Sequence, residues 1–333
     1  MTETARVIRL ARRPGAEIRP GDFEIAEVSL PPPGEGEVLV RNTWMSLDPY
    51  MRLPLTGQSG VHSAMRVGAE MEGAAIGVVE RSAAPGLPVG TIVMSRKGWR
   101  DRFVAPTAGL LQVDGATPPQ WRLGVLGLTG MTAYAGVELV LKPVAGETLF
   151  VSGAAGAVGS IACQLAKRRG ARVIGTAGSA EKVEWLQREL GVDAAANYKT
   201  EDVGGFLARA CPGGLDCYFD NVGGPTLDAV LGAMKPWGRV GLCGAIAQYG
   251  DDNYRAGPRD FFTVIEKGLT VTGFNAGLWG AKAGAQIVPA LAQMLTNGEL
   301  VWRETVVEGL ESAPSAFVSL FDGRNLGKLL VRL

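Results

Sequence analysis

The chain has 333 residues, a length that suggests about two domains with a core large enough to need no disulfide support. Its 33 Lys and Arg residues balance 33 Asp and Glu residues, so no overall field favours nucleic acid or an acidic membrane surface. The hydrophobic fraction of 47% is typical of a globular protein, and no stretch has the roughly 20 continuous apolar residues of a membrane span.

Two further features predict a cytoplasmic protein. The opening "MTETARVIRLARRPG" lacks an apolar segment of signal-peptide length. The cysteines show no paired CxxC spacing, so we interpret them as free thiols in a reducing compartment. They are Cys163, Cys211, Cys217 and Cys243. We expect a small-molecule substrate as partner, with no nucleic acid and no membrane.

Residues 5 to about 113 are predicted to form β-strands separated by turns. Runs such as "EVLVRNTWM" and "AAIGVVERS" are rich in β-branched residues, and segments such as "PPPGEG" and "APGLPVG" bound them. Because no long helical pattern interrupts these runs, we expect a mostly-β unit.

The middle of the chain alternates between strands and helices. Helix-length segments separate most of the strand candidates, which indicates βα units and a parallel sheet wound on both sides. The candidates lie at 148–153, 171–176, 194–198, 215–220, 238–244 and 269–275.

The last segment contains a predicted helix, "ESAPSAFVSLF", and a final strand, "GKLLVRL". A single strand is not stable alone, so we expect it to pair with the N-terminal unit. The mostly-β domain, residues 1–127 plus 298–333, would then be split in sequence by an α/β domain of residues 128–297.

A glycine-rich turn, "FVSGAAGAVG" at 150–159, links a strand to a helix. Gly153, Gly156 and Gly159 recur every third residue, and an apolar helical face follows from Val158 onward. Inside a βαβ unit, this arrangement favours a dinucleotide pyrophosphate bound at the helix N-terminus. The alternative is that the glycines only permit a tight turn.

The residues after this turn indicate which dinucleotide is bound. NAD-specific folds usually carry an acidic residue about 20 positions downstream, where it binds the ribose hydroxyls. No Asp or Glu occurs between Gly153 and Ala180, and Lys182 follows in "GTAGSAEK". A site without a carboxylate and with a nearby ammonium suits the 2′-phosphate of NADP(H), although Lys182 could also be an ordinary exposed lysine.

Several motifs together resemble a known family. They include "GLTGMTAYAGVELVLKPVAGETLFVSGAAGAVGS", "CYFDNVGG", "LCGAIAQY", "SLDPYMR" and "GRNLGK". The chain resembles the medium-chain dehydrogenase/reductase superfamily, and most closely its zinc-independent prostaglandin and leukotriene reductase branch, which includes curcumin and alkenal double-bond reductases. The resemblance implies a GroES-like β domain and a Rossmann domain, the split topology expected above.

The resemblance also implies cofactor contacts. The pyrophosphate turn falls on Gly156, Ala157, Val158 and Gly159. Lys182 and Tyr198 would hold the 2′-phosphate and flank the adenosine, and Asn221 lies where a strand ends. The ribose and nicotinamide would be lined by Cys243, Gly244, Ala245, Ile246, Ala247, Gln248 and Tyr249, and by Phe274, Asn275 and Ala276, with Asn325 reaching the cofactor from the C-terminal segment.

Three of these residues have simpler interpretations. Cys243 could be ordinary strand packing, so we assign it a backbone role only and no role for its thiol. Tyr198 could be a half-buried aromatic residue, and Asn221 could be a turn former.

Zinc is not expected. Zinc-dependent members of the superfamily carry a Gly-His-Glu motif, and here Ala69 of "GAEMEG" takes the place of the histidine. The one histidine, His62, lies in a Gly/Ser-rich segment and is interpreted as a loop residue. One His and four dispersed Cys cannot supply a plausible tetrahedral site.

Without a metal to stabilise an alkoxide, an α,β-unsaturated carbonyl is the better hydride acceptor, because hydrogen-bond donors can stabilise the enolate oxygen. We expect Tyr249 and Tyr50 as these donors, with Asp48 as an N-cap and Pro49 at the first position of a helix that presents Tyr50. The chain departs from mammalian relatives near Glu266, where they carry a tyrosine proposed as the donor.

We therefore expect an NADPH-dependent enone or enal reductase, and a homodimer. The alternatives are a quinone oxidoreductase of the same superfamily and a non-enzymatic NADPH-binding protein.

Overall fold

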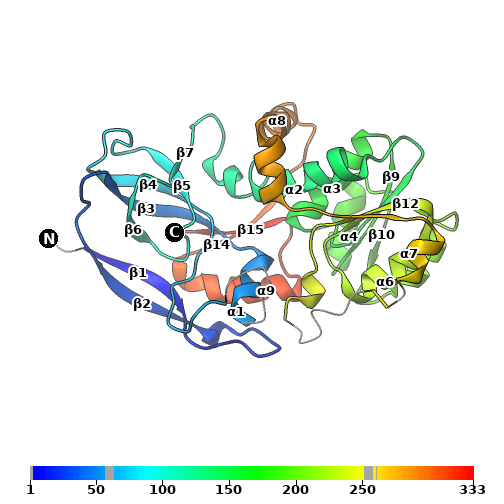
Figure 1. Cartoon of the computed structure of the whole chain (residues 1–333), viewed down its shortest axis with the longest axis horizontal. Helices are drawn as coiled ribbons and strands as arrows, with labels where there is room; N and C mark the ends of the chain where they lie inside the picture. The colour runs from blue at the N-terminus through cyan, green and yellow to red at the C-terminus, as the bar shows by residue number, and fades with distance from the viewer. Residues whose placement is uncertain (1–2, 57–63, 251–257, 260) are drawn as a thin grey trace. The chain divides into compact units, whose positions relative to one another are not determined.

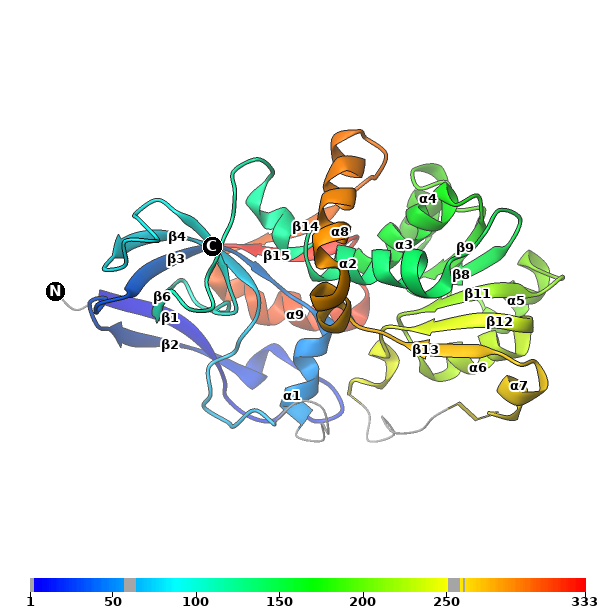
Figure 2. The ribbon, with the colours of Figure 1, turned by 45° about the horizontal axis from the view of Figure 1, so that its top comes forward.

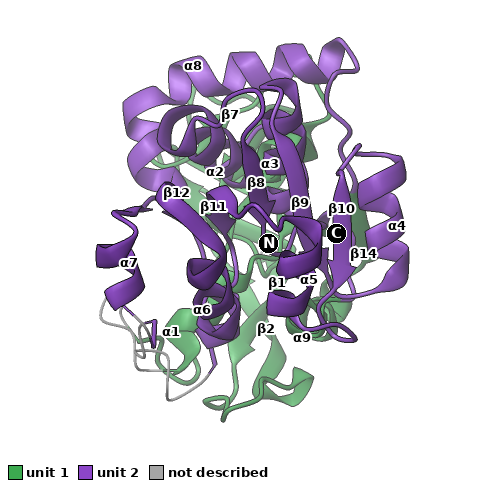
Figure 3. Cartoon of the chain, turned by 90° about the vertical axis from the view of Figure 1, so that its right-hand side faces the viewer, with its two compact units in different colours: residues 1–124, 304–323, 329–333 green, residues 125–303, 324–328 purple. Residues whose placement is uncertain are grey.

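The computed structural model describes residues 3–56, 64–250, 258–259 and 261–333. The chain forms two compact units, coloured separately in Figure 3. Unit 1 comprises Met1–Gly124, Glu304–Gly323 and Leu329–Leu333, and unit 2 comprises Val125–Arg303 and Arg324–Lys328. The compact units change at 124/125 and 303/304, whereas the predicted domain boundaries were 127/128 and 297/298.

Unit 1 is mostly β-structure, as predicted. A hairpin pairs β1 (Glu3–Leu10) with β2 (Phe23–Leu30), and a second sheet has the order β14-β15-β3-β4-β5-β7, with β6 also paired to β3. The bounds of these strands are Glu37–Ser46 (β3), Ala75–Ser82 (β4), Ile92–Ser95 (β5), Arg102–Pro106 (β6), Leu111–Gln112 (β7), Glu304–Glu308 (β14) and Lys328–Arg332 (β15).

The C-terminal strand returns to this unit. Strand β15 pairs antiparallel with β3, with Leu330 opposite Ser46, so the expected return of the final strand is confirmed. The unit's helices are short: α1 (Leu53–Thr56), α9 (Ala313–Asp322) and the 3₁₀ turns η1 (Pro20–Asp22), η2 (Pro49–Arg52), η3 (Pro119–Leu123) and η6 (Leu310–Ser312).

An aromatic cluster fills the core of unit 1. The buried Trp99 ring stacks on Phe23 at 5.7 Å and meets Phe317 of α9 edge to face at 5.5 Å. Because α9 comes from the end of the chain, this cluster joins the two sequence-distant parts of the unit.

Unit 2 contains a six-stranded parallel sheet in the order β10-β9-β8-β11-β12-β13, most of which can be followed in Figure 2. The strands are β8 (Thr148–Val151), β9 (Arg172–Ala177), β10 (Ala194–Asn197), β11 (Leu215–Asp220), β12 (Met234–Leu242) and β13 (Thr270–Gly273). Each overlaps a predicted strand, and the predicted parallel sheet is confirmed.

Helices flank this sheet (Figure 1). They are α2 (Leu128–Tyr134), which continues as the π-helical η4 (Ala135–Leu141), α3 (Ala157–Arg168), α4 (Ala180–Arg188), α5 (Val203–Ala210), α6 (Gly224–Ala233), η5 (Ile246–Gln248), α7 (Phe262–Glu266) and α8 (Ala276–Thr296). Side chains on α5 and α6 pack against Phe150 and Tyr218 on one face of the sheet. Since side chains alternate along a strand, Phe219 points to the opposite face, where its ring contacts Phe274.

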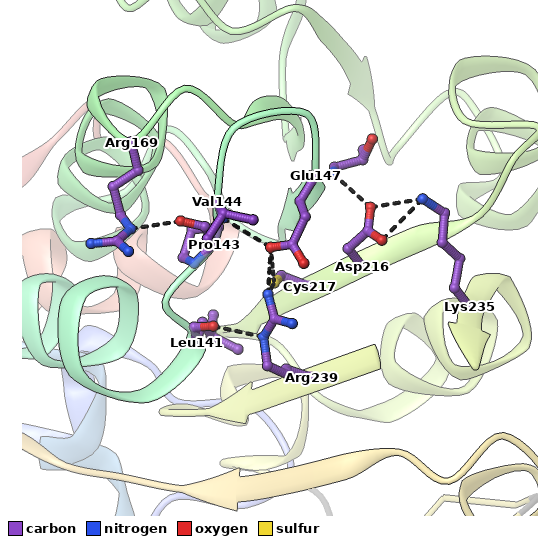
Figure 4. Close-up of polar contacts among 10 residues, drawn as sticks. Leu141, Pro143, Val144, Glu147, Arg169, Asp216, Cys217, Lys235 and Arg239 are labelled. Atoms are coloured by element: carbon purple, nitrogen blue, oxygen red, sulfur yellow. Dashed lines mark hydrogen bonds and ion pairs between the residues drawn. The ribbon is translucent and has the colours of Figure 1, made fainter. Parts of the chain in front are cut away.

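Ion pairs close the amino ends of the central strands (Figure 4). Arg239 of β12 pairs with Glu147, which precedes β8, and also donates to the carbonyl of Leu141 at 2.7 Å. Lys235 pairs with Asp216, whose carboxylate accepts from the Thr148 amide at 2.8 Å. This edge of the sheet is therefore fixed by charged side chains, and the carboxyl edge is left for other groups.

Candidate active site

The sequence-predicted site residues of unit 2 follow the carboxyl ends of its strands. Parallel strands end at the same edge of a sheet, which is where open α/β sheets bind ligands. The glycine-rich turn follows β8, Lys182 follows β9, Tyr198 follows β10, Asn221 follows β11, residues 243–249 follow β12 and residues 274–276 follow β13.

In the glycine-rich turn, the backbone at the start of the helix lies in close contact with the backbone that follows β8. Gly156 caps α3 with an extended conformation, and a Cβ added to Gly159 would lie only 2.4 Å from the carbonyl oxygen of Gly153. The Ser160 amide makes a helical bond to Gly156 at 3.0 Å, so the amides of residues 157–159 precede that bond and point toward the N-terminal end of the helix. Such amides and the helix dipole favour an anion.

The C-terminal segment 324–328 packs on this turn. The Gly327 amide donates to the Ala155 carbonyl at 3.0 Å, and Gly327 forms a β-bridge with Gly156. Asn325 donates from Nδ2 to the carbonyl of Gly327 at 2.9 Å. These contacts place Asn325 beside the turn, although it is more than 150 positions away in the sequence.

Lys182 lies in the first turn of α4, where the Ser179 hydroxyl accepts from its backbone amide at 3.3 Å. Its side chain is only 9% exposed, so the alternative of an exposed helix lysine is wrong. Burial lowers its pKa, and the nearby Lys199 lowers it further, while Glu181 acts in the opposite direction. Lys199 was not predicted from the sequence, although it directly follows Tyr198.

Tyr198 lies against the chain after β9. A Cβ added to Gly178 would lie 2.9 Å from its hydroxyl oxygen, and the side chain is 45% exposed. Burial of the remainder raises the pKa of this phenol. Lys182, Lys199 and Tyr198 therefore gather at the ends of β9 and β10.

Asn221 joins the ends of three strands. Its Nδ2 donates to the Ser152 carbonyl at 2.7 Å, and its Oδ1 accepts from the Cys243 thiol at 3.2 Å. Burial and the neighbouring Asp220 raise the pKa of Cys243 well above its usual value, which keeps this thiol protonated and favours its assignment to a structural role. All four cysteines are free in the structure.

Residues 243–249 form a loop and the short turn η5. The amides of Ile246 and Ala247 donate to the carbonyls of Asn221 and Val222, at 3.3 and 3.1 Å. The half-buried Tyr249 accepts from the Ala245 amide at 3.3 Å through its phenol oxygen. Its hydroxyl is thus held within its own loop.

The residues after β13 divide into two kinds. The ring of Phe274 is buried and packs so closely on Gly136 and Gly241 that a Cβ atom added to either glycine would lie 2.5 or 3.1 Å from it. Because the ring is held in the core, we expect Phe274 to line a site through its backbone. Asn275 caps α8 by accepting from the Leu278 amide at 2.9 Å, and Ala276 begins that helix. Glu266 is exposed at the end of α7, before the amino end of β13, and is therefore apart from these residues.

Tyr50 belongs to unit 1, where it lies in η2 with Asp48 at the N-cap and Pro49 following, as predicted. The expected capping contact is not made, because the Asp48 side chain accepts from Ser46 Oγ and makes no side-chain cap bond to η2. Burial, followed by the nearby Asp48, raises the pKa of Tyr50 to about 12, while Arg96 lowers it. Its phenol therefore stays protonated at neutral pH.

No group of three or more His, Cys, Asp or Glu side chains is placed to hold a metal within the described ranges. Ala69 lies in unit 1 beside Glu70, whose carboxylate pairs with the buried Arg100 at 2.6 Å and with Arg9 at 3.7 Å. His62 lies outside the described residues. The absence of a functional metal stays a prediction. None of the helices in the described residues is long and apolar enough to span a membrane.

The residues at the carboxyl edge fit a dinucleotide with a 2′-phosphate. The glycine-rich turn lets an anion approach backbone amides, and two lysines adjoin the end of β9, where NAD-specific folds place a carboxylate. Relief of the repulsion between Lys182 and Lys199 would itself favour a phosphate dianion.

Comparisons with known proteins agree with this fit. A family model described as the N-terminal domain of oxidoreductase matches residues 6–113, and one described as zinc-binding dehydrogenase matches residues 157–295. The 2-alkenal reductase (NADP(+)-dependent) of Nicotiana tabacum is 40% identical, over 93% of this chain and 92% of that protein.

Two bacterial proteins are similarly close. The NADPH-dependent curcumin reductase of Escherichia coli (strain K12) is 34% identical, over 97% of this chain and 95% of that protein. The crystal structure of CurA from Vibrio vulnificus in complex with NADPH is 35% identical, with a TM-score of 0.93 and 98% of both chains covered.

The fold, the candidate site and the similarity to known proteins together show that the chain is an NADP-dependent oxidoreductase. More particularly, the chain belongs to the zinc-independent prostaglandin and leukotriene reductase branch of the medium-chain dehydrogenase/reductase family, with a GroES-like domain and a Rossmann domain.

Proposed function

We propose that this protein uses NADPH to reduce the carbon–carbon double bond of α,β-unsaturated ketones or aldehydes. The observation that carries the proposal is the continuous lining of one sheet edge, which begins with Lys182 and Tyr198 and ends with residues 243–249 and 274–276. The similarity to an alkenal reductase and a curcumin reductase supports a conjugated double bond as the reacting group.

The strand order supports a direction for the bound cofactor. Lys182, Lys199 and Tyr198 at β9 and β10 would hold the 2′-phosphate and adenosine, and the amides of 157–159 after β8 would bind the pyrophosphate. From β9 to β12 there are three strand spacings, about 14 Å at roughly 4.8 Å each, which suits an extended dinucleotide. The loop 243–249, residues 274–276 and Asn325 would then line the ribose and nicotinamide.

The bound cofactor supplies a hydride, which the β-carbon of the substrate receives. Negative charge then develops on the substrate's carbonyl oxygen, and a protonated phenol can stabilise it by a hydrogen bond. We assign this role to Tyr249, whose loop follows β12, and to Tyr50, because the family resemblance implies tyrosine hydroxyls as donors. The α-carbon takes its proton from solvent.

The rates of NADPH oxidation with three acceptors test this function. A medium-chain 3-alken-2-one and a 2-alkenal should each support turnover that exceeds the rate with a simple quinone. Fast quinone reduction without enone or enal turnover would assign the chain to the quinone oxidoreductases instead.

We also propose that the chain forms a homodimer through the β13 edge of its parallel sheet. β13 is the outermost described strand on that side, and Val271 in it is 40% exposed. Phe261, Phe262 and Ile265 nearby are 61%, 62% and 67% exposed, an apolar group that favours association. Sedimentation equilibrium at micromolar concentration should give twice the chain mass, and a single-chain mass would contradict the proposal.

A further inference from the structure

A buried carboxylate, that of Asp220, lies beneath the candidate site and is not one of the assigned binding or catalytic residues. Asp220 ends β11 and is fully buried. Its Oδ1 accepts from the Tyr218 phenol at 2.5 Å, from the Ser152 hydroxyl at 3.0 Å and from the backbone amides of Val222 and Gly223, both at 2.9 Å. Its Oδ2 has no hydrogen-bond partner among the described residues.

This asymmetry is costly to the fold. A buried carboxylate oxygen without a donor loses its hydration and gains nothing in return. Four donors on the other oxygen exceed what its lone pairs bind well, so the contacts fix direction more than they add stability.

The hydroxyl protons of Tyr218 and Ser152 can each be assigned to one hydrogen bond. The Tyr218 phenol has Ser152 Oγ at 3.2 Å as a second neighbour, but its one proton goes to the closer, charged oxygen of Asp220. Ser152 also donates to Asp220, and its Oγ accepts from the Asn221 amide at 2.9 Å. Burial and then the nearby Asp220 raise the pKa of Tyr218 well above its usual value, so the phenol keeps its proton.

The backbone at Asp220 connects this cluster to both loops at the end of the sheet. The Asp220 carbonyl accepts from the amides of Cys243 and Gly244, at 3.0 and 3.2 Å. Oδ1 holds the amides of residues 222 and 223, and the carbonyls of residues 221 and 222 hold those of 246 and 247. A shift of the carboxylate would therefore move the 221–224 turn and the 243–249 loop together.

We propose that Asp220, oriented by Tyr218 and Ser152, is a positioning residue that sets the 221–224 turn and the 243–249 loop for the nicotinamide half of the cofactor. The inference rests on the proposed function, because it uses the cofactor direction given there. Asp220 is buried beneath these loops and acts only through them.

Two ligands distinguish a role of Asp220 in positioning the two loops from a general loss of structure in the whole binding site. NADPH spans the whole edge, whereas adenosine 2′,5′-bisphosphate reaches only the ends of β9 and β10 and the turn after β8. Tyr218→Phe leaves three donors on Oδ1 and removes one oriented bond. Titration calorimetry should show NADPH binding about fivefold weaker and bisphosphate binding within about twofold of the wild type.

Ser152→Ala is the second variant, and Tyr134→Phe is the matched control. Ser152→Ala should give the same split between the two ligands. Tyr134 is half-buried in α2 and bonds to Gln286, so its loss should change neither affinity.

Equal losses of both ligands in Tyr218→Phe, or an unchanged NADPH affinity, would overturn the positioning role. A wrong cofactor direction would give a different result. In that case the wild-type protein would not bind the bisphosphate, or Lys182→Ala would not weaken bisphosphate binding.

Discussion

At the residue scale, we expect Lys182 to decide between the two nicotinamide cofactors. Lys182 is a buried residue with Lys199 nearby, so a 2′-phosphate there would gain a charge-assisted contact that NADH cannot make. Lys182→Ala should weaken NADPH by roughly 1.5–3 kcal/mol, or about 10–100-fold, and leave NADH nearly unchanged. Fluorescence titration with both cofactors measures this. Lys167→Ala, which removes a surface pair with Asp193, is the control and should change neither. Equal losses for NADPH and NADH would remove the assigned role.

The pH dependence follows from the same side chain. The phosphate needs the protonated amine, and the lowered pKa of Lys182 means that the free protein loses this proton at a lower pH than an exposed lysine would. The 2′-phosphate stays doubly charged above a pKa of about 6. NADPH affinity should therefore fall as pH rises through the lowered pKa, while NADH affinity stays flatter. If the affinities for NADPH and NADH changed with pH in the same way, this role of Lys182 would be contradicted.

Two tyrosines are assigned to the developing enolate. An oxyanion donor is often worth about 10²–10³ in rate, but a ribose hydroxyl can share the role, so we expect about a tenfold lower kcat from Tyr249→Phe or Tyr50→Phe. Because the pKa of Tyr50 is raised to about 12, kcat should not fall through loss of its proton below about pH 11. Steady-state rates with a saturating enone measure this, and unchanged kcat in both variants would exclude both donors.

At the scale of elements, the segment 324–328 supports the glycine-rich turn. Gly327 has φ +68°, and an added Cβ would lie 2.1 Å from the Arg303 carbonyl oxygen. Gly327→Ala should cost roughly 2 kcal/mol or more of unfolding free energy and weaken NADPH binding, because the segment must move off the turn. Urea unfolding and NADPH titration are the measurements.

Gly284→Ala is the matched control for this change. Gly284 lies in α8, and an added Cβ meets nothing within 4 Å, so this variant should be about 0.5–1 kcal/mol more stable with unchanged NADPH binding. If Gly327→Ala lowered stability and left NADPH affinity intact, the segment would be structural only.

The opposite edge of the sheet should affect stability alone. Glu147 pairs with Arg239 and accepts from the Val144 amide, and both paired side chains are less than a third exposed (Figure 4). Glu147→Gln should lower the free energy of unfolding by about 1–3 kcal/mol and leave NADPH affinity within about twofold. Glu184→Gln, in a helix pair with side chains 56% and 78% exposed, should cost less than about 0.5 kcal/mol. Similar costs for the two variants would contradict the assigned role of the buried pair.

At the scale of the whole molecule, the sequence was enough to predict where the strands of the parallel sheet lie along the chain, but not their order in the sheet. Hydrophobic runs and turn residues report local structure directly, so all six strands of the parallel sheet and the return of the final strand to the N-terminal unit were predicted. Strand β14 was missed because "ETVVE" is short and has one flanking charge at each end. The π-helical turn 135–141 was missed because an apolar face at that spacing resembles an α-helix.

The site was predictable to a smaller extent. Motifs identified which residues follow each strand, but they could not indicate which way a side chain points. Phe274 turns into the core, and Asp48 bonds to Ser46, because packing decides these directions. The contact of Asp220 with Ser152 depends on β8 and β11 being neighbours, which no local pattern encodes.

In the proposed reaction, hydride from NADPH reaches the β-carbon of a conjugated carbonyl compound. The most direct measurement uses NADPH deuterated at its hydride-donating carbon, with a medium-chain 3-alken-2-one as substrate, and locates the label in the product by mass spectrometry and NMR. We predict a saturated ketone with deuterium on its β-carbon. An allylic alcohol with deuterium on the former carbonyl carbon would contradict the account.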